Sequence, residues 1–305
     1  MSTSRFVHAL RKQELRVQRP GQRVSGLALR RELERKFNAL QQDYAELHAE
    51  IFEAAQVHRR LCAPRVVRYA DFEIANEIFA VRHLAGDFFT VNNSPDGVVL
   101  VLGDICGKGL AAGMWTTHLV GRVNVHASSD SNPARIVSEV NNDVCLTGQL
   151  APLASLFVAR LNPDTGRLDY CSAGHPPAIL LRNTGEVELL CDGGLLLGVI
   201  PSASYMTGSV QLRPGDVLLA YSDGVLESRN GAEEEFGLAR LENQLRQANQ
   251  GGAAAEALLF SVLASVQDFA GTHPLVDDLS LAVIKRSDQD QNQRGQSVEP
   301  LHPFF

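Results

Sequence analysis

The chain has 305 residues, of which 45% are hydrophobic and 21% charged, and its formal net charge is −7. This composition is that of an ordinary soluble protein with enough apolar residues for a sizeable core in one or two domains. The longest apolar runs, such as VVLVL, are far shorter than the roughly 18 residues of a membrane span. The first residues also lack the apolar stretch of a secretory signal, so we expect neither membrane insertion nor secretion.

The cysteines point to a reducing compartment. Their number is odd, they are scattered, and no Cys-x-x-Cys pair occurs among Cys62, Cys106, Cys145, Cys171 and Cys191. Disulfide frameworks and zinc sites use paired spacings, so we expect a cytoplasmic protein with reduced cysteines.

Residues 1–28 are predicted to form a basic, flexible arm, interrupted by Pro20, Gly21 and Gly26. The first 36 residues hold ten Arg or Lys against three Glu, and the rest of the chain is acidic. An acidic body disfavours nucleic-acid binding, and a solvated basic terminus is the simpler interpretation of the arm. We therefore predict no nucleic-acid or membrane partner, and we regard the N-terminal region as a possible binding site for an upstream activator.

A long helix is predicted over residues 29–62. Apolar positions alternate in steps of four and three, which is the heptad pattern of a two-stranded coiled coil. They are Leu33, Phe37, Leu40, Tyr44, Leu47, Ile51, Ala54 and Leu61, with His58 at the remaining position. A single amphipathic helix packed on its own domain gives nearly the same pattern over four heptads. We favour a homodimer through residues 33–61 and leave the second interpretation open.

Residues 65–286 are rich in predicted strands separated by turns such as NSPDG and NPDTG, with helical stretches between groups of strands. Short hairpin loops indicate antiparallel sheets, and the helices indicate a covering layer, so we predict one α+β layered domain. The strands are expected at 72–81, 87–92, 98–103, 154–161, 167–173, 178–182, 187–190, 207–212, 217–222 and 279–285. The helices are expected at 109–127, 133–147, 238–248 and 253–269. The polar segment 287–305 is predicted to be a disordered tail.

The stretch VLGDICGKGLAAG begins like a phosphate-binding loop, but only three residues separate Gly103 from Gly107, and Gly109 stands where a P-loop has Ser or Thr. Nucleotide binding is therefore the weaker interpretation. What remains is an acid, Asp104, at the end of an apolar strand.

Three further acids, Asp87, Asp223 and Asp277, are predicted to lie at strand edges like Asp104. Carboxylates brought together this way repel one another unless a cation is bound, and oxygen ligands select magnesium or manganese. Each acid alone would be interpreted as a turn residue or cap. Four such acids together predict a metal site.

The order of these motifs resembles the SpoIIE-type branch of the metal-dependent serine/threonine protein phosphatases of the PPM superfamily, which contains RsbU-like regulators of bacterial stress sigma factors. The resemblance is carried by EAAQVHRRLCAP, AVRHLAGDFF, LGDICGKGLAAG, SLFVARLNPDTGRLDYCSAGHPPAILL, LLLGVIP, LRPGDVLLAYSDGVLESRN, EEFG and DDLSLAVIK. It covers about three quarters of the chain. The resemblance implies an αββα sandwich with two divalent cations, Mn²⁺ or Mg²⁺, in a cleft at the sheet edges.

Carried over by position, the resemblance implies that Asp104 bridges both cations beside the carbonyl of Ile105. Asp223 and Asp277 would hold one cation, Asp87 would complete the site, and Asp104 and Asp223 would be essential for catalysis. Two metals lower the pKa of a bridging water and stabilise charge on phosphoryl oxygens. Asp278 is the less favoured ligand of its pair.

The chain departs from the family pattern Gly-Gly-Asp-Phe-Tyr-Asp at Ala85 and Thr90, which raises the prospect of weaker metal affinity. Cys106 stands where eukaryotic relatives have histidine, and it is a poor candidate for a nucleophile because no Arg-rich phosphate loop accompanies it. His175, in SAGHPP, is interpreted as structural. Lys108 at a predicted helix start suggests a nearby anion.

Arg82 is a candidate phosphate contact, and an exposed strand arginine is its equally simple explanation. The implied function is hydrolysis of phosphoserine or phosphothreonine on a regulatory protein, an anti-sigma-factor antagonist in a partner-switching pathway. A catalytically weak or inactive signalling scaffold of the same fold is the main alternative, and a nucleotide-binding or cyclase domain is the third.

Overall fold

The computed structural model describes residues 26–148 and 152–287 and divides the chain into two units, Met1–Glu53 and Ala54–Phe305. The predicted arm and tail therefore lie almost wholly outside the described residues. No described helix is both long enough and apolar enough to cross a membrane.

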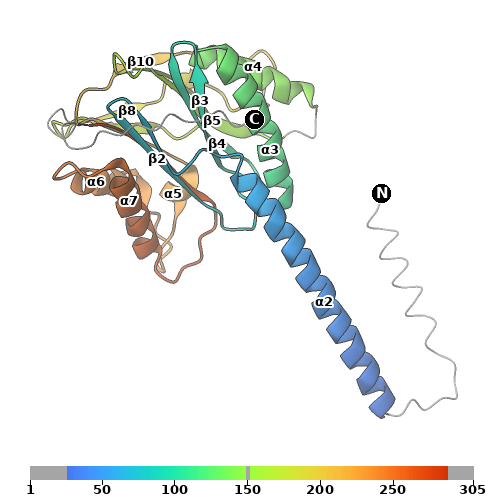
Figure 1. Cartoon of the computed structure of the whole chain (residues 1–305). Helices are drawn as coiled ribbons and strands as arrows, with labels where there is room; N and C mark the ends of the chain where they lie inside the picture. Colours follow the sequence, from blue (N-terminus) through green and yellow to red (C-terminus); the bar gives the residue numbers. More distant parts are fainter. Residues whose placement is uncertain (1–25, 149–151, 288–305) are drawn as a thin grey trace. The chain divides into compact units, whose positions relative to one another are not determined.

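The first unit contains most of helix α2, Gly26–Arg59 (Figure 1). The helix begins at Gly26, three residues earlier than expected. The first five predicted seam side chains leave between 53% and 66% of their surface exposed: Leu33, Phe37, Leu40, Tyr44 and Leu47. Apolar side chains at heptad spacing are thus open along this part of the helix.

The second unit is an αββα sandwich, as predicted. Its strands are β1 (Val66–Tyr69), β2 (Phe72–Phe79), β3 (Phe88–Ser94), β4 (Gly97–Ile105), β5 (Ala154–Leu161), β6 (Arg167–Ala173), β7 (Ala178–Leu181), β8 (Val187–Leu190), β9 (Gly193–Gly194), β10 (Gly208–Gln211), β11 (Val217–Tyr221) and β12 (Leu279–Arg286). Its helices, besides the end of α2, are α3 (Leu110–Ser129), α4 (Pro133–Leu146), α5 (Asp223–Glu227), α6 (Gly237–Ala248) and α7 (Ala255–Ala270).

The strands form two sheets in the orders β1-β2-β12-β11-β7-β8 and β10-β6-β5-β4-β3, with β9 added beside β6. We call them sheet A and sheet B. All pairs are antiparallel except β6 with β9. Helices α3 and α4 cover sheet B, and α6 and α7 cover sheet A (Figure 1).

Strand alternation divides the apolar residues among three cores. Leu100 and Leu102 of β4 pack between the sheets, whereas Val99 and Val101 face α3 and α4. On sheet A, Ala282 and Ile284 of β12 face the space between the sheets, and Leu281 and Val283 face α6 and α7. Both faces of each sheet are buried, which explains why these strands are apolar throughout.

Nearly all predicted strands and long helices are found within a few residues of their expected bounds. Helix α4 begins as expected, with the Asn132 side chain accepting a hydrogen bond from the Arg135 backbone N–H at 3.0 Å. Three short elements were missed: β1, β9 and α5. Strand β9 is two glycines and α5 is five residues, so neither is long enough to show a period.

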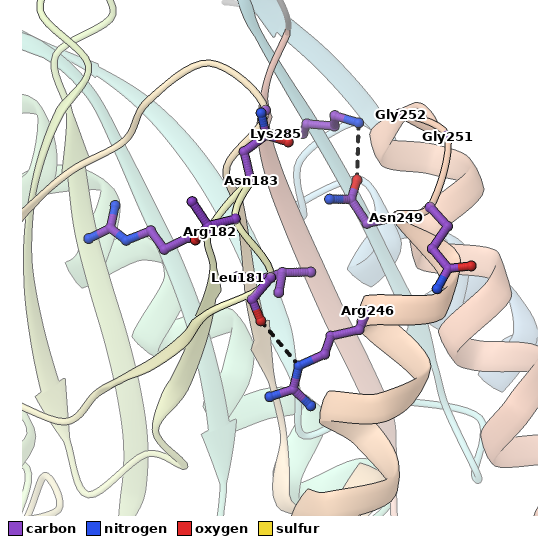
Figure 2. Close-up of a pocket in the computed structure, with 12 residues that line it drawn as sticks. Leu181, Arg182, Asn183, Arg246, Asn249, Gly251, Gly252 and Lys285 are labelled. Carbon is purple, nitrogen blue, oxygen red and sulfur yellow. Dashed lines mark hydrogen bonds between the residues drawn. The ribbon is translucent and has the colours of Figure 1, made fainter.

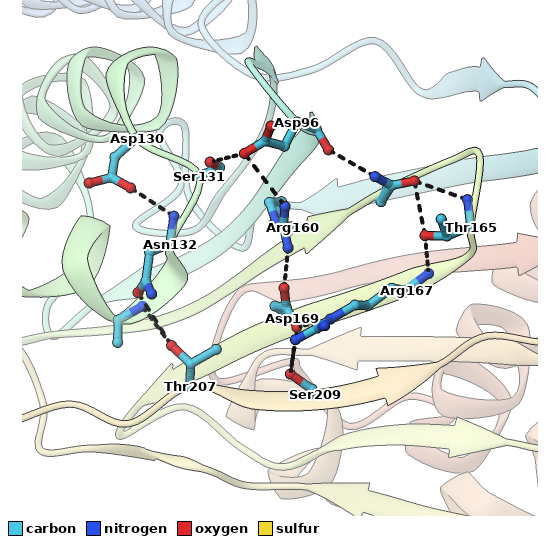
Figure 3. Close-up of polar contacts among 12 residues, drawn as sticks. Asp96, Asp130, Ser131, Asn132, Arg160, Thr165, Arg167, Asp169, Thr207 and Ser209 are labelled. Carbon is cyan, nitrogen blue, oxygen red and sulfur yellow. Dashed lines mark hydrogen bonds and ion pairs between the residues drawn. The ribbon is translucent and has the colours of Figure 1, made fainter.

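A polar network ties the edge of sheet B together (Figure 3). Asp169, which is buried, accepts hydrogen bonds from Arg160, Arg167 and Ser209. Arg160 also lies near Asp96, whose carboxylate accepts a hydrogen bond from Ser131 at 2.8 Å. These charges are matched by protein partners, so the network stabilises the packing of β5, β6 and β10.

Candidate functional site

The predicted acids converge at one end of the sandwich because of strand direction. Asp87 precedes β3 and Asp104 nearly ends β4, and antiparallel pairing of Phe88 with Gly103 brings these ends together. On sheet A, Asp223 follows β11 and Asp277 precedes β12, which are also antiparallel neighbours. The side chain of Ser280, on β12, donates a hydrogen bond to Asp87 and so joins the two sheets at this end.

The carboxyl groups perturb one another. Burial raises the pKa of Asp87 well above its usual value, and the neighbouring Asp104 raises it further. Burial, together with Asp223 and Asp277, raises the pKa of Asp104 to about 6. Burial and Asp277 likewise raise the pKa of Asp223. The structure therefore brings together all four acids that the sequence predicted.

Two glycines permit this close approach. A β-carbon at Gly86 would stand 3.1 Å from the carbonyl oxygen of Ile105, so the predicted carbonyl ligand faces the loop before Asp87. A β-carbon at Gly224 would stand only 2.2 Å from the carbonyl oxygen of Asp278. The glycine after Asp223 is thus required for β12 to pass beside α5.

Asp278 has a different role from Asp277. Its two carboxylate oxygens accept backbone N–H groups of Val81 and Gly86, each at 2.8 Å. The side chain is buried and fastens the loop that carries Asp87. Asp277, whose oxygens contact the Asp278 backbone N–H at 2.9 Å and Lys108 at 2.7 Å, is the more exposed acid of the pair.

Lys108 supplies the positive charge beside the acids. Its ammonium group lies 2.7 Å from the Asp277 carboxylate and donates to the Val276 carbonyl at 2.5 Å. It also opposes the rise in the pKa of Asp223 that burial and Asp277 cause. The anion expected near this lysine is therefore Asp277, from the opposite sheet.

The oxygen ligands offered by the four acids are those that a divalent cation prefers. The side chains are not arranged as a complete metal site. Among residues 26–148 and 152–287, no three acidic, histidine or cysteine side chains are grouped as a metal would require. Asp87 is hydrogen-bonded to Asp104, and Asp277 pairs with Lys108. Carboxylates that raise one another's pKa are stabilised by a hard cation.

Comparison with known proteins decides the family. The family model described as stage II sporulation protein E matches residues 94–287, well over half of the chain. The chain belongs to the SpoIIE family. Its sheet domain is accordingly a serine/threonine phosphatase domain of the PPM type.

Curated relatives support the assignment. Phosphoserine phosphatase RsbU of Bacillus subtilis is 24% identical over 246 residues, which cover 79% of this chain and 71% of RsbU. Protein IcfG of Synechocystis is 28% identical over 195 residues, 54% of this chain. That alignment covers only 31% of IcfG, so the chain spans about a third of this relative.

Solved structures show the same fold. The SiaA-PP2C domain of Pseudomonas aeruginosa superposes with a TM-score of 0.69 at 18% identity, covering 80% of this chain and 98% of that domain. The RsbU and RsbW domains of Rv1364c from Mycobacterium tuberculosis give 0.62 at 24% identity, covering 71% of this chain and 62% of that one.

The departures of this SpoIIE domain from the family motif fall on well-packed positions. Ala85 is buried, and the Gly86 carbonyl next to it accepts a hydrogen bond from Thr116 of α3 at 2.9 Å. Thr90 is buried on β3, where it alternates with Phe89 and Val91 of the core between the sheets. It therefore faces α3, on the side of the sheet away from Asp87.

Three further residues were weighed from the sequence. Cys106 is largely exposed, but partial burial of its thiol and the nearby Asp104 raise the pKa of that thiol, so it is a poor nucleophile. Burial lowers the pKa of His175 to about 3, and its ring bonds Ser155 at 2.7 Å, which agrees with a structural role. Arg82 is exposed and passes beside Gly109, whose β-carbon would stand 3.7 Å from its side chain.

Sequence reasoning missed the buried hydroxyls of Ser155, Ser222 and Ser280. Along each strand, the serine occupies the same alternating set of positions as core residues that face the space between the sheets, for example Ser280 with Ala282 and Ile284. A serine at such a position near a strand end could have been predicted to point toward the site. These hydroxyls bond His175, the Asp278 backbone and Asp87 respectively.

A pocket of about 450 Å³ lies away from the acids, near the far end of β12 (Figure 2). Its lining includes Arg182, Arg246 and Lys285, and it holds none of the predicted site residues. Arg182 points away from the other two cations in Figure 2 and pairs with Glu188 and Asp216. This pocket and the predicted chemistry are therefore at different places.

Proposed function

We propose that this protein is a metal-dependent phosphatase that hydrolyses phosphoserine or phosphothreonine on a regulatory protein, an anti-sigma-factor antagonist in a partner-switching pathway. The observation that carries the proposal is the convergence of four acids from two sheets, where burial and neighbouring carboxylates raise the pKa values of Asp87, Asp104 and Asp223. The similarity to phosphoserine phosphatase RsbU supports the substrate class.

The chain's own residues would act as a cation-binding frame. Asp104 and the Ile105 carbonyl would be ligands of two divalent cations, Asp223 and Asp277 would hold one of them, and Asp87 would complete the site. Bound Mn²⁺ or Mg²⁺ would supply an activated water and neutralise charge on the phosphoryl oxygens. Arg82, which extends beside Gly109, would contact the phosphate through its planar fork.

The test is turnover of a chromogenic phosphate ester with Mn²⁺ or Mg²⁺, before and after chelation. Activity should depend on the metal and fall by several orders of magnitude in Asp223→Asn. Asp164→Asn, in the exposed turn between β5 and β6, removes one carboxylate elsewhere and should leave the rate unchanged. Full activity of purified Asp223→Asn at saturating metal would refute the site.

The substrate is proposed to be recognised through protein docking, because a metal centre contacts mainly the phosphate. A whole phosphorylated regulatory protein should be cleaved far more efficiently than a short phosphopeptide of the same sequence. Equal efficiency would contradict docking.

A non-catalytic scaffold is the less supported function. It rested on the altered motif around Asp87, and the packing of Ala85 and Thr90 leaves the Asp87 carboxylate beside Asp104. Metal-dependent turnover above that of Asp104→Asn would exclude it.

We further propose that the protein is a homodimer through the helical segment 33–61 and that an activator binds the N-terminal region. The exposed seam side chains of α2 support pairing over residues 33–47. His58 does not extend that seam, because it is buried within the second unit with Asp278 near it. We also propose a cytoplasmic location, from the odd number and the scattered spacing of the five cysteines.

A further inference from the structure

We propose that Lys108 is a resident cation that competes with the divalent cation for Asp277 and thereby sets the metal affinity of this protein. The inference rests on the proposed function, because it takes Asp277 as a metal ligand. It concerns the lysine that the protein itself places beside the Asp277 carboxylate.

The position of Lys108 is built by the loop between β4 and α3. Gly107 and Gly109, on either side, have φ values of 140° and 79°, which favour glycine. The loop turns the lysine toward the segment before β12, where its ammonium lies 2.7 Å from Asp277 and donates to the Val276 carbonyl at 2.5 Å. The ion pair thus connects the end of sheet B to the start of the last strand of sheet A.

A lysine at this place is unfavourable by local rules. It lies next to Gly109, the N-cap of α3, whose N-terminus carries the positive end of the helix dipole, and no acidic residue lies in the first turn. The compensating negative charge comes from Asp277, about 170 residues later in the chain. Only about a third of the lysine side chain is exposed, 34%, so the contact is partly shielded from solvent.

In this proposal both cations compete for the carboxylate of Asp277, of which one oxygen faces Lys108 and the other accepts the Asp278 backbone N–H at 2.9 Å. The ammonium group is a compact charge with three donors, two of which are used by Asp277 and the Val276 carbonyl. A divalent cation bound by Asp277 and Asp223 would meet this positive charge within the same carboxylate cluster. We therefore expect metal bound at Asp277 to displace Lys108, and the free energy of that displacement is subtracted from the free energy of metal binding.

The simplest alternative is a surface ion pair that contributes little to stability, as many surface ion pairs do. It predicts that removing the lysine charge leaves metal binding unchanged. Competition predicts the opposite sign from ordinary loss of a site residue, because deleting Lys108 should tighten binding.

The experiment is a titration of the full chain, freed of metal by chelation, with Mn²⁺, using the EPR signal of unbound Mn²⁺ as the readout. Lys108→Met and Lys108→Gln should bind Mn²⁺ about tenfold more tightly than the wild type, within the range typical of coupled ligands. Lys108→Arg, which keeps the charge, should stay close to the wild type. In the Asp277→Asn background, Lys108→Met should have no effect.

Unchanged or weaker binding by both Lys108→Met and Lys108→Gln, with thermal unfolding showing folded protein, would overturn the inference. The proposed function is checked separately by Asp104→Asn, which should lose Mn²⁺ binding. If Asp104→Asn loses binding while the Lys108 variants equal the wild type, only the competition fails. If Asp104→Asn binds Mn²⁺ like the wild type, the metal site itself is wrong, and the inference falls with it.

Discussion

The buried carboxylates near the two ends of strand β12 have opposite kinds of neighbours. Asp216, at the end near Lys285, is buried and has protein partners on every side, with Arg182 at 2.8 Å and the backbone N–H groups of Asn183 and Arg213 at 2.9 and 3.0 Å. Asp87, at the other end, is equally buried, but its neighbours are the Ser280 hydroxyl and another carboxyl, Asp104.

The difference separates a structural charge from a functional one. A buried carboxylate with matched donors holds the fold together, and its removal leaves an unpaired cation. A buried carboxylate beside other carboxylates destabilises its own charged form, and an external cation is the natural partner. Burial of an acid alone therefore does not locate the site, whereas the signs of its neighbours do.

The largest expected effect is on catalysis at the unmatched end. Asp104→Asn should lower metal-dependent phosphatase activity by several orders of magnitude, while the free energy of unfolding of the metal-free protein stays equal or rises, because one of several like charges is removed. Steady-state rates and urea unfolding of the same preparation measure both. A variant that unfolds instead would show that Asp104 is structural, like Asp216.

At the other end of β12, substitution of Asp216 should change stability and leave activity unchanged. Asp216→Ala leaves Arg182 with only the more exposed Glu188 and removes the acceptor of two backbone N–H groups, so it should lower the free energy of unfolding by about 3 kcal/mol. Its activity per folded molecule should remain near that of the wild type. Urea unfolding gives the first quantity, and rates corrected for the folded fraction give the second. A stable variant with little activity would contradict the comparison.

A third prediction concerns pH. The folded-state pKa of Asp104, about 6, lies above its unfolded value, so its stabilising contribution is complete below pH 4 and is lost as the pH rises through 6. In the metal-free protein, the unfolding free energy of the wild type relative to Asp104→Asn should therefore fall by about 2 kcal/mol between pH 4.5 and 7.5. Parallel urea curves at both pH values test this.

Saturating Mn²⁺ should reverse that loss in the wild type at pH 7.5, because a ligand that binds only the folded state stabilises it. Identical pH dependence of the two proteins without metal would mean that Asp104 is not perturbed by its neighbours.

A smaller effect is expected for dimerisation through α2. Leu40→Asp with Leu47→Asp places charges in the predicted seam and should convert the full chain from dimer to monomer in sedimentation. Gln42→Asp with Ala49→Asp, which has the same spacing on the outer face of the heptad, is the matched control and should remain dimeric. A wild type that sediments as a monomer would leave the seam unexplained.

The smallest effect is expected at the altered motif. Ala85→Gly restores the family residue, but Ala85 is buried and its φ is not in the left-handed region. The change should lower the free energy of unfolding by about 1 kcal/mol and alter Mn²⁺ affinity less than twofold. A large gain in affinity would show that Ala85 weakens the metal site.

Local patterns in the sequence determined much of this protein. Apolar strands, turn residues and the Asn132 cap predicted most element bounds, because alternation, turn chemistry and capping depend on neighbouring residues only. The ordered motifs, with their acids at strand edges, predicted the sandwich and the four acids Asp87, Asp104, Asp223 and Asp277.

Tertiary structure alone decided which charges meet. Asp278 fastens the loop at Gly86, Ser280 bonds Asp87, and Lys108 pairs with Asp277, each across about 170 residues or more of sequence. These contacts depend on β12 lying between β2 and β11 and on two sheets facing each other. No local period encodes that strand order, since it follows from how all the apolar faces are buried together.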